Sequence, residues 1–196
     1  MPGPDFAEEI AELANARKQL VLERQQFADQ LADQSVPRVN VWAKDVFLSQ
    51  AKVADRMSAN DIRALREEIS LGAHEIAAHI RSLPRASHWP MEALQRLLAS
   101  RVSWSQSDDE YAISMMQHDV NEGAKSHFDN INRAMSDAGL TSGTAFDSRI
   151  IWGTHDVRPI LTAARNVALK EQVLEEARAA FTQQTLANRW EAAEPA

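Results

Sequence analysis

Histidines beside carboxylates are the side chains of this chain whose types best suit metal or acid–base chemistry. Three of the six histidines directly precede an acid: His74-Glu75, His118-Asp119 and His155-Asp156. On a helix, Glu75 and His79 share one face because they are four residues apart. The same spacing relates His118 to Glu122. Two such carboxylate–imidazole pairs on separate helices are the kind of donor set that holds a divalent metal inside a helical bundle.

A metal bound by His79, His118 and Asp119 would polarise a phosphoryl oxygen and lower the pKa of a bound water molecule. Glu122 or Glu75 would then act as the general base. This set predicts, as the alternative function, a metal-dependent phosphohydrolase of the HD type or another carboxylate–histidine enzyme, with a divalent metal as cofactor. The residues around His118-Asp119 lack the small apolar run and the following glycine that are typical of HD enzymes.

Other catalytic motifs are absent from the sequence. It contains no Gly-rich phosphate loop, no nucleophile elbow and no dinucleotide fingerprint. Its lack of cysteine excludes disulfides, a thiolate nucleophile and thiolate metal ligands. We therefore expect a non-enzymatic protein without a cofactor as the first interpretation.

The first helix carries a heptad seam that includes two arginines. Its residues recur at alternating steps of four and three: Phe6, Ile10, Leu13, Arg17, Leu20, Arg24, Phe27 and Leu31. This is the spacing by which a helix packs lengthwise on other helices. Arg17 and Arg24 are expected either to extend their charged ends into solvent or to pair with acids of another helix. The candidate acids within the chain are Glu67, Glu68, Glu175 and Glu176.

Proline, glycine and capping residues divide the chain into helices. We expect helices over about 5–35, 43–57, 60–83, 91–102, 107–138 and 157–192. Pro37 and Pro84 are expected to end the helices before them, and Gly123 to kink or split the fifth helix. Gly139 is expected to cap that helix, and 141–156 to form a loop. The predicted fold is all-α: an elongated bundle of about six to seven helices, with three long helices and a smaller helical cap.

These helices are expected to form one domain with three segments. Residues 1–84 are the N-terminal hairpin with the heptad seam, 85–156 an acidic cap of short helices and loops, and 157–196 a long C-terminal helix that packs on the bundle. The acidic character of the cap is marked. Between Trp104 and Asp147, eight acids and two bases give −6 of the net charge of −7.

Charge and hydropathy restrict the classes of partner. A net charge of −7 without a basic face disfavours nucleic acid. The longest apolar runs have three residues, whereas a membrane-spanning helix needs about 20. With no signal-peptide pattern at the start, a cytoplasmic protein without membrane contact is expected.

We therefore expect a helical interaction subunit or adaptor that acts within a larger complex, as a homo-oligomer or bound to another protein. Trp and Arg are enriched among the anchor residues of such interfaces. The residues expected to contact a partner are Arg17, Leu20, Arg24, Phe27, Trp89 and Trp152.

Overall fold

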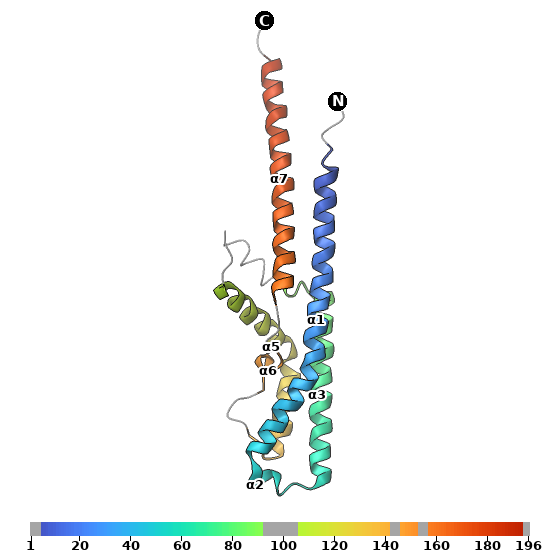
Figure 1. Cartoon of the computed structure of the whole chain (residues 1–196), viewed down its shortest axis with the longest axis vertical. Coiled ribbons are helices and arrows are strands. Elements are labelled where there is room, and N and C mark those ends of the chain that lie inside the picture. Colours follow the sequence, from blue (N-terminus) through green and yellow to red (C-terminus); the bar gives the residue numbers. More distant parts are fainter. Residues whose placement is uncertain (1–4, 92–105, 142–145, 153–156, 194–196) are drawn as a thin grey trace. The chain divides into compact units, whose positions relative to one another are not determined.

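The computed structural model describes residues 5–91, 106–141, 146–152 and 157–193 of the 196-residue chain (Figure 1). These residues form six helices and no strand: α1 (Ala7–Ser49), α2 (Ala51–Ala54), α3 (Ala59–Ala86), α5 (Gln106–Asp137), α6 (Ser148–Trp152) and α7 (Arg158–Ala192). The predicted all-α helical bundle is confirmed. The helix predicted over 91–102 lies outside the described residues, apart from Met91.

The helices belong to two compact units. Residues 1–23 and 158–196 form the first, which we call the two-helix unit because it contains the start of α1 and all of α7. Residues 24–157 form the second, which we call the bundle unit. The predicted boundary at 156–157 lies beside one of these divisions, whereas the predicted boundary at 84–85 falls inside the bundle unit.

In the two-helix unit, α1 and α7 pack antiparallel through the predicted seam. Phe6 near the start of α1 meets Phe181 far along α7, with ring centroids 6.3 Å apart. Further along α1, Leu13 and Leu20 are buried. Arg17 forms a 3.0 Å ion pair with Glu171, which lies one helical turn before Glu175, one of the four candidate acids. The seam therefore exists, with a different acid as partner.

The main correction concerns α1, which continues through Pro37 to Ser49 although a connector was predicted at 36–42. A proline inside a helix removes one hydrogen bond and costs about 3 kcal/mol. Val39 and Val46, beyond the proline, are both buried, and their packing keeps this stretch helical. The helix predicted over 43–57 is consequently the end of α1 followed by the short α2.

Glycines allow α3 and α5 of the bundle unit to approach closely. A Cβ atom on Gly123 of α5 would lie only 2.5 Å from His79 Nε2, and one on Gly72 of α3 only 2.7 Å from Ile131 Cγ1. Neither position has room for a larger residue without a shift of its neighbour. α5 is continuous through Gly123, so the predicted split is wrong, and Gly123 instead admits a side chain of α3.

As a result the described residues contain four long helices instead of the predicted three, because α5 is a single helix of 32 residues. It ends as the sequence predicted. Gly139 adopts a φ of 79°, and the N–H of Leu140 donates to the carbonyl of Met135 at 2.9 Å. This is the hydrogen bond of a Schellman cap.

Part of the predicted loop at 141–156 is the short helix α6, held by side chains of α5. The amide of Asn132 brackets Phe146 through its oxygen at 2.9 Å and its nitrogen at 3.1 Å. Asn121 Oδ1 accepts from the N–H of Ser148 at 2.9 Å. Ile151 and Trp152 of α6 are buried, and their burial stabilises this helix. The polar composition of 141–156 had predicted a loop instead.

The contact of Gly123 with His79 makes a testable prediction. Gly123→Ala should lower the free energy of unfolding by about 1–3 kcal/mol, because the added methyl group overpacks the α3–α5 contact. In a His79→Ala background the same substitution should raise it by up to about 1 kcal/mol, since alanine is the better helix former. Urea unfolding of the four proteins measures both effects. Destabilisation by the same amount in both backgrounds would contradict the role of His79.

Candidate functional site

The predicted metal ligands lie in different surroundings. His79 is half-buried where α3 meets α5, whereas His118, Asp119 and Glu122 are exposed on α5. Within the described part of the chain, no group of three or more His, Asp or Glu side chains is placed to hold one metal ion. The spacing along each helix was as predicted, but packing does not gather these residues into one site.

His79 instead faces a second histidine that sequence reasoning did not single out. His127 of α5 lies near His79, and its Nδ1 is 3.0 Å from Glu75 Oε2. Burial lowers the pKa of His79, and the charge on a protonated His127 lowers it further. The Nε2 atom of His79 is buried and has no hydrogen-bond partner among the described residues. His79 is therefore neutral at pH 7, a packing residue that resists protonation.

The two seam arginines have different roles. Arg17 is exposed in its ion pair with Glu171. Arg24 pairs with none of the predicted acids but donates to backbone carbonyls in the last turn of α3 and just after it. Its Nη2 is 3.1 Å from Pro84 O, 3.0 Å from Ser87 O and 3.1 Å from Trp89 O.

The end of α3 explains this position of Arg24. α3 continues to Ala86, two residues past the proline that was predicted to end it, and leaves terminal carbonyls without helical partners. A guanidinium group satisfies several of them at once. Burial lowers the pKa of Arg24, but an arginine stays charged in proteins. Arg24 is therefore a cap for α3.

Four other predicted contact residues are buried within the chain. They are Leu20, Phe27, Trp89 and Trp152. Phe27 lies between the two tryptophans, with ring centroids 5.8 Å from Trp89 and 5.7 Å from Trp152. Such aromatic contacts stabilise a core, and in this structure they join α1 to the segments after α3 and in α6.

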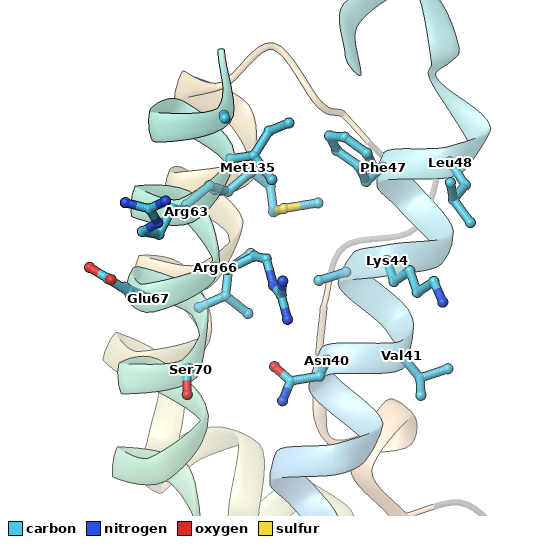
Figure 2. A pocket seen from close by; sticks show the side chains of 15 residues that line it. Asn40, Val41, Lys44, Phe47, Leu48, Arg63, Arg66, Glu67, Ser70 and Met135 are labelled. Carbon is cyan, nitrogen blue, oxygen red and sulfur yellow. The ribbon is translucent and has the colours of Figure 1, made fainter. Parts of the chain in front are cut away.

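A groove of about 850 Å³ lies between α1 and α3 (Figure 2). Figure 2 shows Asn40 and Arg66 extending into the space between the two helices, with Phe47 and Met135 near one end. Its walls are mainly apolar and come from three helices of the bundle unit: Asn40, Val41, Ala43, Lys44, Phe47, Leu48, Ala59, Ile62, Arg63, Leu65, Arg66, Glu67, Ile69, Ser70 and Met135.

Charge distinguishes this groove from the rest of the chain. Lys44, Arg63 and Arg66 line it and are exposed, and none of them forms an ion pair or hydrogen bond with the described residues. Glu67 is the one acid in the lining. The groove thus combines an apolar surface with an excess of two positive charges.

The apolar surface extends beyond the groove along α1. Val41 is 59% exposed and Leu48 61% exposed. Together with Lys44 they are spaced i, i+3 and i+7, so they form one ridge on α1. The sequence contained this spacing, but the break predicted after Pro37 hid it.

Comparisons with known proteins do not assign this chain to a family: no family model, curated protein or solved structure matches it. In the described part of the chain, every helix is too short or too polar to cross a bilayer.

The contacts of the two seam arginines predict different effects of their removal. Arg24→Ala should lower the free energy of unfolding by about 1.5–3 kcal/mol, because it removes hydrogen bonds from a charged donor to otherwise uncapped carbonyls. Arg17→Ala should cost about 1 kcal/mol or less, as expected for an exposed ion pair. Urea unfolding followed by circular dichroism compares them, and equal losses would refute the capping role. Arg24→Lys should recover only part of the loss, because an ammonium group lacks the planar fork.

The lowered pKa of His79 predicts a loss of stability in acid. The unfolded chain binds a proton at His79 near pH 6.5, whereas the folded chain binds it only at lower pH. The stabilising contribution is therefore complete above pH 6.5 and decreases as the pH falls through the lowered pKa. His79→Leu should reduce the fall in melting temperature between pH 7.5 and pH 5, with exposed His118→Leu as the matched control. An unchanged pH dependence in His79→Leu would show that His79 does not cause it.

Proposed function

We propose that this chain is a non-enzymatic interaction subunit that receives an acidic amphipathic helix of a partner protein in the α1–α3 groove. The observation that carries the proposal is the group of three cations, Lys44, Arg63 and Arg66, beside an apolar surface and without partners in the described residues. Acids outnumber bases by seven in the whole chain, whereas bases outnumber acids by three to one in the lining of the groove. Such cations attract an acidic partner.

The shape of the groove favours a helix as the bound element. Two neighbouring antiparallel helices form a trough into which a third helix lays its apolar face. Arg81 of α3 pairs with Asp33 of α1, and Arg24 reaches the end of α3, so the two helices run antiparallel. The ridge of Val41 and Leu48 lengthens the apolar surface along α1. A bound helix would cover this ridge as well as the groove.

Electrostatics supply the choice of partner. Acids that flank the apolar stripe of the bound helix would meet Lys44 on α1 and Arg63 or Arg66 on α3. Charges at the rim of an interface mainly raise the association rate and exclude partners of the wrong sign. Their contribution decreases with ionic strength, because exposed charges are screened within about 8–10 Å at physiological salt.

The proposal uses the groove residues instead of the seam residues first considered. Leu20, Phe27, Trp89 and Trp152 are buried in the chain itself and stabilise its fold. We do not propose a metal-dependent reaction, because His118 and Asp119 are exposed and no third ligand is grouped with them among the described residues.

A pair of synthetic peptides tests the proposal. Both are amphipathic helices of about five turns with the same leucine stripe, flanked by glutamates in one and by lysines in the other. The glutamate peptide should bind roughly tenfold or more tighter than the lysine peptide, and the difference should shrink in high salt. Fluorescence anisotropy measures the affinities. Val41→Asp with Leu48→Asp should weaken both peptides.

Charge reversal provides the matched control. A triple variant, Lys44→Glu with Arg63→Glu and Arg66→Glu, should prefer the lysine peptide. The control reverses three exposed cations of the bundle unit that do not line the groove, Lys52, Arg85 and Arg133, and should keep the original preference. If both triple variants behave alike, only the net charge of the protein matters and the groove is not the site.

A further inference from the structure

Helix α7 carries a second heptad stripe that the two-helix unit leaves uncovered. Its residues recur at steps of four and three: Leu169, Val173, Glu176, Ala180, Gln183, Ala187 and Trp190. All seven are exposed, Leu169 by 61% and Trp190 by 79%. Leu169, Val173 and Trp190 are large and apolar, and apolar side chains at coiled-coil spacing on one face of a helix are typical of packing against another helix.

The start of α1 does not cover this stripe, because it packs on the other side of α7. Val167 and Leu174 are buried there, and Phe181 meets Phe6. Leu169 follows Val167 by two residues, which turns it about 200° round the helix. In addition, α7 continues for about three turns past Phe181, whereas Phe6 directly precedes the first residue of α1.

The stripe is complementary to itself when two copies run antiparallel with Ala180 at the two-fold axis. Val173 then lies opposite Ala187 of the second copy, and Leu169 lies within one residue of the level of Trp190. The polar positions also come together, because Glu176 lies within one residue of the level of Gln183 and can accept a hydrogen bond from its amide. Each contact occurs twice, as a two-fold interface requires. The small residue stands at the axis and the largest residues at the ends.

Charge also favours a second copy as the occupant. α7 carries five bases and four acids, so it is nearly neutral in a chain of net charge −7 and can approach its own copy without strong repulsion. Lys170 and Glu191 lie on the same flank of the stripe, and the antiparallel alignment places each opposite the other in the second copy. Glu191 has no partner among the described residues. Lys170 already pairs with Glu12 at 2.5 Å, which leaves its other hydrogens for a second acid.

From these observations we infer that the far face of α7 joins two copies of this chain in an antiparallel dimer. This interface goes beyond the proposed function, because it uses α7 of the two-helix unit and none of the groove residues. Loss of one interface would leave the other in place.

Sedimentation velocity of the full chain tests the dimer. A species of twice 21.9 kDa should form with rising concentration. Leu169→Asp with Trp190→Asp should weaken dimerisation roughly tenfold or more, with an unchanged circular dichroism spectrum because both side chains are exposed. Leu22→Asp is the matched control, since Leu22 is equally apolar and 56% exposed on α1, and it should dimerise like the parent. A monomer at all concentrations, or a dimer insensitive to the α7 substitutions, would overturn the inference.

Cysteine cross-linking tests the antiparallel direction. The chain has no cysteine, so any disulfide formed is the one introduced. Val173→Cys with Ala187→Cys should give a covalent dimer on oxidation, because the two positions face each other across the axis. Val173→Cys alone should cross-link poorly, since its partner position in the second copy is Ala187. Efficient cross-linking by Val173→Cys alone would indicate a parallel pair and overturn the proposed alignment.

Discussion

The close approach of α3 and α5 is the constraint on which the bundle unit depends. Gly72 and Gly123 each leave out a side chain where the other helix inserts one, so the two backbones can come together over buried Ile76, Ile80, Met116 and Val120. This contact holds α3 in place. α3 in turn supplies one wall of the groove, and its last carbonyls are capped by Arg24. A substitution at either glycine would therefore shift the α3 wall of the groove, although neither glycine lines the groove.

The same contact contains a buried polar atom without a hydrogen-bond partner in the described residues. His79 Nε2 is buried against Gly123 without a hydrogen-bond partner, and an unsatisfied group of this kind costs about 1–3 kcal/mol. Its neutral form is the less costly one, because burial and His127 both oppose a charge. The aromatic ring nevertheless fills the space that Gly123 leaves. Close packing of the ring and a hydrogen bond to its nitrogen are thus incompatible at this position, and the structure has the close packing.

Sequence reasoning succeeded where periodicity alone decides the outcome and failed where distant residues decide it. The seam from Phe6 to Leu31, the start of α5 and the Gly139 cap all depend on local spacing, and all were predicted. The continuation of α1 through Pro37 depends on burial of Val39 and Val46 by other helices. The requirement for glycine at position 123 depends on contact with His79, which is 44 positions earlier in the sequence. The groove was missed for the first of these reasons, because the predicted break at 36–42 separated Asn40 and Val41 from the rest of its α1 wall.

The two proposed surfaces suit different partners because their charges differ. Two copies of the groove would bring unpaired cations together, so a contact between grooves is disfavoured, and an acidic helix from another protein is the better match. The far face of α7 is nearly neutral, and its large, small and polar positions match themselves under a two-fold axis. The two surfaces belong to different units and share no residue, so each can have its own partner. The expected product is a complex of two chains and two acidic helices. For a partner that carries two such helices, dimerisation raises the effective concentration of the second groove once the first is occupied.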